Sequence, residues 1–305
     1  MNEIEKNLLH EVAELDALPV GAYNIRSDGK SVARNTSANI DIVTKQDKPG
    51  IDIIIKPGTK RESVHIPVII SQTGLTECVY NDFFVGDDSD VTIIAGCGIH
   101  NCGDQTSRHD GVHTFYIGKN CKVRYVEKHY GEGEGTGKRV MNPETRIELG
   151  ENSTMELETS QIAGVDDTVR TTGAKLSANA TLTIHDKILT TGDQKAVAEI
   201  MVDMDGTDSS CDIISRGVAK EHSTQEIRLG INGNCACTGH AECDSIIMDE
   251  AKILAIPQLN AANVDASLVH EAAIGKIAGE QLMKLMTLGL SEAEAEEKIV
   301  QGFLR

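Results

Sequence analysis

A weak internal repeat between residues 85 and 180 restricts the fold of this chain more than any other sequence feature. Each copy starts with an apolar residue, followed by Gly or Ser, any residue, Asn or Asp and a small residue, and then by alternating apolar residues. The copies begin at Val85, Ile117, Leu149 and Leu176, which are 32, 32 and 27 residues apart. A turn residue that tolerates left-handed geometry, followed by a β-strand and recurring at this period, is typical of stacked coils. The repeat therefore predicts a parallel β-helix.

The predicted strand region extends well beyond the repeat. From about residue 22 to 255 helical periodicity is lost, and alternating apolar segments such as 51–55 and 182–184 replace it. A sandwich of hairpins is the alternative fold. However, the Asp-Gly and Asn-Gly turns that hairpins favour occur only four times, too few to connect a meander of this length.

Helical periodicity is confined to the two ends of the chain. Residues 3–18 have apolar residues at helical spacing and Pro19 follows them, so a short amphipathic helix is expected there. After Pro257 an apolar stripe from Ile274 to Met286 predicts a helix that Gly289 ends. The capping box 291–294 then begins a second helix that reaches about Phe303. We therefore expect three regions: an N-terminal helical segment (1–21), a β-helix core (22–265) and a C-terminal helical domain (266–305).

Composition excludes several classes of function. Lys and Arg number 29 against 47 Asp and Glu, and the formal charge of −18 repels nucleic acid and anionic membranes. Aromatic residues are 3% of the chain, so stacking surfaces for sugars or bases can hardly be built. No apolar run approaches the roughly 20 residues of a membrane span, and the first residues do not resemble a signal peptide. We expect a cytoplasmic protein without nucleic-acid or membrane partners, whose eight cysteines are reduced thiols.

The usual enzyme motifs are absent from the sequence, including Walker A, HExxH, G-x-S-x-G and CxxC. The glycine-rich segment 131–138 contains two acidic residues that would repel phosphate, so it is interpreted as a flexible loop. Chemistry is instead indicated by two concentrations of cysteine and histidine. The first contains Cys97, His100, Cys102, His109 and His113, and the second contains Cys235, Cys237, His240, Cys243, His270 and Glu271.

Thiolate, imidazole and carboxylate together form a ligand set for zinc or iron. For any single one of these residues a buried thiol or a surface histidine is the commoner explanation. The second group is stronger, because Glu271 follows Cys243 by 28 residues, close to the period of the coils. Residues one coil apart stack about 4.8 Å apart, so the two side chains are expected to face the same space.

The second half of the chain resembles the SufB/SufD proteins of iron–sulfur cluster assembly. The matching segments occur in family order with family-like spacing, and weaker likeness extends back to about residue 80. These segments are Ile213-Ile214-Ser215-Arg216-Gly217-Val218, His222-Ser223, Cys243-Asp244-Ser245, His270-Glu271-Ala272, Gly279-Glu280-Gln281-Leu282, Gly289-Leu290-Ser291-Glu292 and Ile299-Val300-Gln301-Gly302-Phe303.

The resemblance implies a right-handed parallel β-helix with a C-terminal helical domain that binds the ABC-type ATPase SufC. It also implies a dimer, here a homodimer, whose interface holds an iron–sulfur cluster of [4Fe–4S] or [2Fe–2S] type. The cluster-binding residues that it transfers are Cys243 and Glu271, with His270 beside them. The chain looks like a short form of SufB. Glu148 and Leu149 stand near the position where longer relatives have a cysteine, which makes an internal sulfur relay through that position doubtful.

The resulting hypothesis is a non-catalytic scaffold that assembles a cluster and releases it to apo iron–sulfur acceptor proteins. Harder ligands such as Glu271 or His270 hold iron less firmly than thiolates, which suits a donor. One rival is a β-helical hydrolase or lyase acting on polysaccharides, against which the scarcity of aromatic residues counts. Composition also leaves open a structural β-helix protein that binds no metal. The roles of Cys97, Cys235 and Cys237 as ligands or packed thiols remain open as well.

Overall fold

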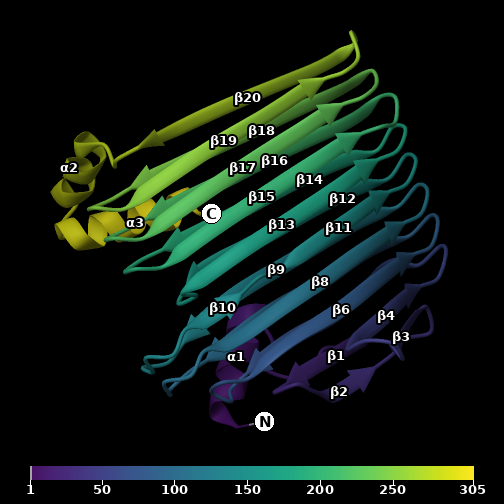
Figure 1. The fold of residues 1–305 in the computed structure, drawn as a ribbon, viewed down its shortest axis with the longest axis horizontal. Coiled ribbons are helices and arrows are strands. Elements are labelled where there is room, and N and C mark those ends of the chain that lie inside the picture. The colour runs from purple at the N-terminus through teal and green to yellow at the C-terminus, as the bar shows by residue number, and fades with distance from the viewer. Residues whose placement is uncertain (1) are drawn as a thin grey trace.

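The computed structural model describes residues 2–305 and confirms a mainly β fold. It is a β-solenoid with one short helix before it and two helices after it (Figure 1). Met1, where the expected segment 1–21 begins, lies outside the described residues. Two ten-stranded sheets face each other across a hydrophobic core, and nearly every coil contributes one strand to each sheet.

The two sheets, A and B, are parallel except for one antiparallel pair at the first end of each, β1–β2 and β3–β4. Sheet A runs in the order β2 (Lys30–Asn35), β1 (Ala22–Ser27), β5 (Lys60–Ile70), β7 (Asp90–His100), β9 (Lys122–Glu132), β12 (Thr154–Ala163), β14 (Thr181–Thr190), β16 (Ser209–Ala219), β18 (Cys237–Ile247) and β20 (Ala266–Gly275). Sheet B runs in the order β19 (Lys252–Ala261), β17 (Thr224–Gly233), β15 (Lys195–Met204), β13 (Asp167–Leu176), β10 (Arg139–Met141), β8 (Ser107–Ile117), β6 (Thr76–Val85), β4 (Gly50–Ile55) and β3 (Ile40–Thr44). Strand β11 (Glu144–Leu149) also lies between β8 and β13.

The turn residues of the repeat have the left-handed backbone that the sequence predicts. Asn120, Asn152 and Asn179 have φ of 55°, 57° and 55°, and Asp88 has φ of 58°. The turns also stack, because Asn120 Nδ2 donates to Asp88 Oδ1 at 3.1 Å and Asn179 Nδ2 donates to Asn152 Oδ1 at 3.1 Å. Each copy of the repeat therefore marks one corner of a coil.

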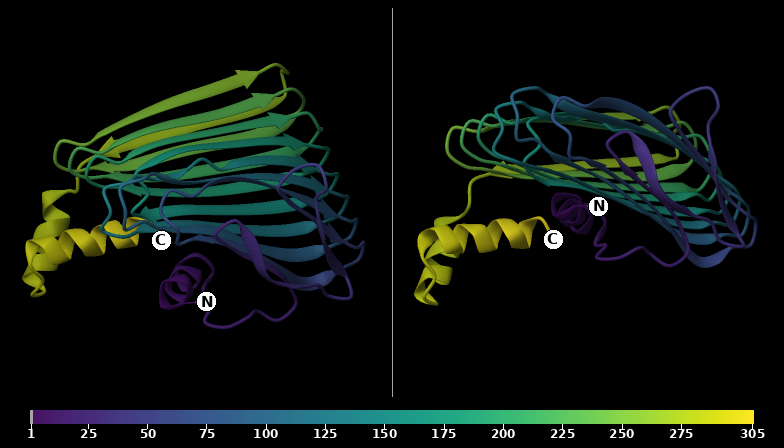
Figure 2. Two further views of the ribbon diagram at one scale, coloured as in Figure 1. Left: turned by 60° about the horizontal axis from the view of Figure 1, so that its bottom comes forward. Right: turned by 90° about the horizontal axis from the view of Figure 1, so that it is seen from below.

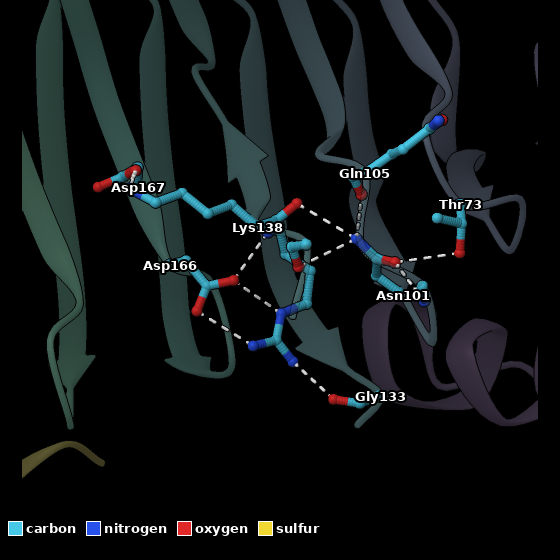
Figure 3. A network of polar contacts seen from close by, with 10 residues as sticks. Thr73, Asn101, Gln105, Gly133, Lys138, Asp166 and Asp167 are labelled. Atoms are coloured by element: carbon cyan, nitrogen blue, oxygen red, sulfur yellow. Dashed lines mark hydrogen bonds and ion pairs between the residues drawn. The ribbon is translucent and has the colours of Figure 1, made fainter. Parts of the chain in front are cut away.

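The glycine-rich segment 131–138 is not a free loop but follows the coil beside it (Figure 3). The amides of Gly135 and Gly137 donate to the carbonyls of Asn101 and Gly103 at 3.0 and 2.9 Å. Asn101 Nδ2 also donates to the carbonyl of Gly137 at 3.0 Å. A Cβ at Gly133, whose φ is +108°, would lie 2.3 Å from the Asn101 carbonyl oxygen, so glycine permits this close stacking.

The N-terminal helix α1 (Glu3–Ala13) is shorter than the apolar pattern of residues 3–18 predicts. It lies against sheet A (Figure 2), where Leu8 and Val12 pack over Gly96 and Gly98. A Cβ at Gly96 would lie 2.6 Å from the Val12 carbonyl oxygen. The two glycines therefore allow the helix to approach the sheet closely.

The C-terminal helices α2 (Gly279–Thr287) and α3 (Glu292–Phe303) stand out from one end of the solenoid (Figure 2). The capping box of Ser291 and Glu294 is present as predicted. The first of these helices begins at Gly279 rather than near Ile274, because Ile274 lies on β20 and pairs with Ser245 of β18. In residues 2–305 no helix is both long and apolar enough to span a membrane.

Candidate functional site

The predicted ligands lie on β18 and β20, at the end of the solenoid where sheet A stops. Side chains of a strand alternate between the interior and the outer face. Residues that are paired in register across two parallel strands share a face, so the register decides which ligands meet.

Cys243 points into the interior. It is 1% exposed and stacks in register between Ser215 of β16 and Ala272 of β20. Burial, together with the charges of Asp244 and Asp186, raises the pKa of the Cys243 thiol to about 11, although a hydrogen bond with Ser245 opposes the shift. The thiol is therefore protonated at neutral pH, and metal binding there must displace a proton.

His270 faces the same interior space. Its register partner is Ala241, which is fully buried on the same side of β18 as Cys243. Neither ring nitrogen of His270 has a hydrogen-bond partner within residues 2–305, although both are shielded from solvent. Both imidazole nitrogens are thus free of competing hydrogen bonds from the chain.

Glu271 lies on the opposite, outer face, in register with Glu242, and its side chain is 68% exposed. Its Oε2 is 3.9 Å from His240 Nε2, and His240 Nδ1 is hydrogen-bonded to Asp212 Oδ1 at 2.8 Å. Donor atoms of His240, Glu242 and Glu271 all lie within 4.8 Å of one another. Burial and the neighbouring Asp244 raise the pKa of Glu242, as expected where carboxylates crowd together.

The expectation that Cys243 and Glu271 face the same space is therefore wrong for this structure. Cys243 pairs with Ala272, so paired residues of β18 and β20 are 29 residues apart in the sequence. Glu271 follows Cys243 by only 28 residues and therefore lies on the other face. The structure brings Cys243 together with His270 inside the solenoid, and Glu271 together with His240 outside.

The other two cysteines of this region are not next to Cys243. Cys237 is an interior residue near the beginning of β18, and Cys235 Sγ lies 3.3 Å from the Met204 carbonyl oxygen. Both belong to the packed core of the last coils.

The first concentration of cysteine and histidine divides into two groups. Cys102 Sγ contacts His100 Nε2 at 3.0 Å in a partly exposed pair, whereas Cys97, His109 and His113 point into the interior. There the structure adds two residues that the sequence analysis missed, Glu127 and His129 of β9. The signal was their alternation with the buried Tyr125, which indicates that all three side chains face inward.

Comparison with known proteins agrees with this architecture. Residues 72–303 match the family model described as "SUF system FeS cluster assembly, SufBD core domain". A SufBD family protein of Methanocaldococcus jannaschii is 28% identical over 258 residues, which cover 83% of this chain and 79% of that protein. A SufBD family protein of Pyrococcus horikoshii is 25% identical over 98% of this chain and 94% of its own length.

Other relatives are matched over less of their length. The chain spans 62% of a SufBD family protein of Methanothermobacter thermautotrophicus at 28% identity. The iron–sulfur cluster assembly protein SufB of Bacillus subtilis is 36% identical, but over 100 residues that cover 32% of this chain and 22% of that protein.

Proposed function

The chain belongs to the SufBD family of the SUF system for iron–sulfur cluster assembly, and we propose that it is a non-catalytic scaffold for assembly and transfer of a cluster. The cluster is the cargo of the protein, and apo iron–sulfur proteins are its acceptors. The observation that carries the proposal is the position of Cys243, a thiol one coil below the open end of the solenoid, with an imidazole free of hydrogen bonds on the same face.

The available ligand atoms favour a cluster that is bound reversibly and can be transferred. Cys243 offers one thiolate per chain, His270 a nitrogen and Glu271 an oxygen, and the last two are harder ligands for iron than sulfur. One chain therefore supplies too few thiolates to retain a cluster firmly. In a homodimer related by a twofold axis, each chain would give Cys243 and one second ligand, so that two chains together supply four ligands.

The open end of the solenoid supports dimerisation there. Strands β19 and β20 each end a sheet and have backbone groups without a neighbouring strand. Side chains on these strands are exposed even at positions that face the core in preceding coils, as Ile274 at 42% exposure illustrates. A second copy of the chain that covers this end would bury that surface and bring the two Cys243 thiols toward one interface.

The helices α2 and α3 support an ABC-type ATPase of the SufC type as partner. No residue of α2 is buried, and its apolar side chains Met283 and Met286 face solvent. Arg216 of β16 anchors α3, because its Nη1 donates to the Phe303 carbonyl at 3.1 Å and its guanidinium lies over the Phe303 ring. ATP hydrolysis in the partner can thus act through α3 on the strand next to β18.

Anaerobic reconstitution with iron and sulfide tests the proposal. The wild-type protein should develop the visible absorption of an iron–sulfur cluster, and Cys243→Ser should lose it or hold it too weakly to isolate. Cys211→Ser is the matched control, since Cys211 is also a buried interior cysteine of sheet A, and it should retain the cluster. Equal iron content per dimer in wild type and Cys243→Ser would overturn the proposal.

A further inference from the structure

An exposed cysteine just after β7 belongs to a chain of three polar side chains that the proposed function does not use. Cys102 Sγ lies 3.0 Å from His100 Nε2, and His100 Nδ1 lies 3.0 Å from Glu132 Oε1. Cys102 is exposed, whereas the side chains of His100 and Glu132 are 17% and 30% exposed. We call these three residues the surface triad. In sheet A the coils of β12, β14 and β16 separate it from β18, so it does not belong to the site at Cys243.

The register of the coils brings His100 and Glu132 together. They are the last residues of β7 and β9, and they pair in register although they are 32 residues apart in the sequence. Side chains that are paired in register on parallel strands share a face of the sheet. Cys102 follows His100 by two residues, after the strand has ended, and its thiol contacts the imidazole.

The hydrogen bonds decide which nitrogen of His100 faces the thiol as an acceptor. A carboxylate only accepts, so His100 Nδ1 donates its proton to Glu132 Oε1. In the neutral imidazole the lone pair is then on Nε2, and the Cys102 S–H donates to it. Nε2 can therefore take the thiol proton, and Glu132 stabilises the imidazolium that forms. A nucleophile beside a base that a third group orients is the arrangement of activated cysteines in enzymes.

The turn that carries Cys102 is held by Asn101, which is fully buried (Figure 3). The Oδ1 of Asn101 accepts from Thr73 Oγ1 and from the Gly103 amide, both at 3.0 Å. The Nδ2 of Asn101 donates to the Gln105 carbonyl at 2.8 Å. The thiol is thus exposed on a turn whose backbone is well anchored, which holds it beside the imidazole.

The glycine-rich segment 131–138 lies beside this turn and leaves the thiol uncovered. A Cβ at Gly135 would lie 2.3 Å from the Gly103 carbonyl oxygen and 2.6 Å from the Cys102 carbonyl carbon, so glycine permits this close approach. A glycine also has no side chain that could screen the thiol. The thiol therefore stays open to a large reagent on this side.

The backbone around Cys102 does not favour acyl transfer, which needs free amides to bind an oxyanion. The amides of Gly103 and Gly135 donate to Asn101, and the amide of Gly137 donates to the Gly103 carbonyl at 2.9 Å. These three neighbouring amides are therefore occupied. Substitution at sulfur needs no oxyanion site, because the negative charge passes from the attacking sulfur to the departing one.

We propose that Cys102 is a nucleophile toward the S–S bond of a disulfide or a persulfide, with His100 as its general base and Glu132 as the positioning residue. The Cys102 sulfur forms a bond to one sulfur of the reagent, and the S–S bond of the reagent breaks. His100 accepts the Cys102 proton and passes it to the departing thiolate. One S–S bond replaces another, so no further oxidant is needed. The product is a mixed disulfide or a persulfide on Cys102.

Reaction with glutathione disulfide and, separately, with glutathione persulfide tests the proposal. The protein used is the full-length, metal-free Cys243→Ser variant, here called the parent protein, which lacks the thiol of the proposed cluster site. Mass spectrometry of the peptides measures the reaction of each cysteine. Glutathione disulfide should add a glutathionyl group to Cys102 and glutathione persulfide one sulfur atom, so the faster reaction identifies the source.

The rate at Cys102 should depend on the imidazole. At pH 7 His100→Gln should slow the reaction about tenfold, because a cysteine without a base is only a few per cent thiolate. Free imidazole should restore His100→Ala toward the parent rate, which a purely structural role would not allow. His10→Gln is the matched control and should change nothing, since His10 is an exposed imidazole that pairs with Asp16 at 2.9 Å. In urea the rates of the parent protein and His100→Gln should become equal, because the surface triad exists only in the folded chain.

The role of Glu132 has its own pair of variants. Glu132→Gln keeps an acceptor for His100 Nδ1 but loses the charge that stabilises the imidazolium, so it should react more slowly than the parent protein. Glu132→Asp keeps the charge and should recover part of the rate.

Equal rates at Cys102 in the parent protein and His100→Gln with both reagents, or no rescue of His100→Ala by imidazole, would overturn the proposal. If the His100 variants do not fold, the Glu132 variants decide the question, and equal rates in both of them and in the parent protein refute it. Because the parent protein lacks Cys243, a failure of the proposed cluster function would leave these rates unchanged.

Discussion

The Cα of Cys243 pairs with that of Ala272 across β18 and β20, and not with that of Glu271. The thiol and the carboxylate are thus one residue out of register. A shift of one residue along a strand moves each side chain to the opposite face, so the two groups lie on different faces. For both residues to bind one metal centre, β20 must shift or bulge at His270 and Glu271. The position of β20 as the last strand of sheet A, paired on one side only, makes it the strand with the fewest constraints against such a change.

The turn ladder gives a prediction about stability. Asn152 has φ of 57° and accepts a hydrogen bond from Asn179. Asn152→Ala should lower the free energy of unfolding by about 2 kcal/mol, because alanine pays about 1–2 kcal/mol in the left-handed region and the hydrogen bond is lost. Asn152→Gly loses only the hydrogen bond and should cost about 1 kcal/mol. Urea unfolding measures both, and equal losses would contradict the conformational part of the argument.

The fold could be predicted from the sequence because its determinants are local. Asn or Asp at a left-handed turn and apolar alternation recur in each coil, and neither depends on the exact coil length. The face of Glu271 does depend on it. Between successive coils from β5 onward the registers range from 27 to 32 residues, and no local feature fixes the last one at 29.

Two other differences between the structure and the predictions from sequence arise from tertiary contacts. Ile274 continues an apolar stripe at helical spacing, but the free edge of β18 provides backbone partners that keep it in a strand. The buried histidines of β8 lie opposite Glu127 and His129 of the other sheet, so the stretch from Cys97 to His113 shows only part of this group. In the sequence, Glu127 is recognisable only as an inward-facing residue that alternates with Tyr125.

The open end of the solenoid is where we expect the proposed homodimer to form. Ile274 on β20 is an interior-facing residue left 42% exposed by the lack of a further coil. Ile274→Lys should place a charge in the proposed interface and convert the dimer to a monomer in light scattering. Val169→Lys is the matched control, because Val169 is 50% exposed on the outer face of β13, away from that end. A wild-type protein that is monomeric at micromolar concentration would contradict the dimer itself.

The exposed face of α2 is where we expect the proposed ATPase partner to bind. Met283 and Leu288 are 63% and 76% exposed, and apolar side chains grouped on an unburied helix favour a protein partner. Met283→Asp should reduce co-purification with a SufC-type ATPase at least tenfold, the loss expected for a well-packed interface residue worth more than about 1.4 kcal/mol. Val32→Asp, also on an exposed apolar side chain but at the other end of the molecule, should bind normally. Deleting residues 289–305 should abolish binding while the β-sheet circular dichroism signal stays.

Thiol reactivity provides a test of the interior position of Cys243. The pKa of its thiol is raised to about 11 by burial, so little thiolate forms near neutral pH. Cys102 is exposed, and iodoacetamide should modify it many times faster than Cys243 at pH 8. Raising the pH toward 11 should narrow the difference, because the thiolate is the reactive form. Mass spectrometry of the labelled peptides measures both rates, and similar rates at pH 8 would show that Cys243 is accessible.

The alternation of His270 and Glu271 predicts which of them assists Cys243. His270 shares the interior face with the thiol, whereas Glu271 faces His240 on the outside. If the cluster binds while β20 keeps its register, His270→Ala should lose most of the iron bound per dimer, and Glu271→Ala should retain most of it. His240→Ala should behave like wild type, because removing it changes only the outer group. The opposite result, with iron lost in Glu271→Ala and retained in His270→Ala, would mean that β20 leaves its present register to bind the cluster. Circular dichroism of each metal-free variant provides the control for folding, so that a loss of iron can be attributed to a lost ligand.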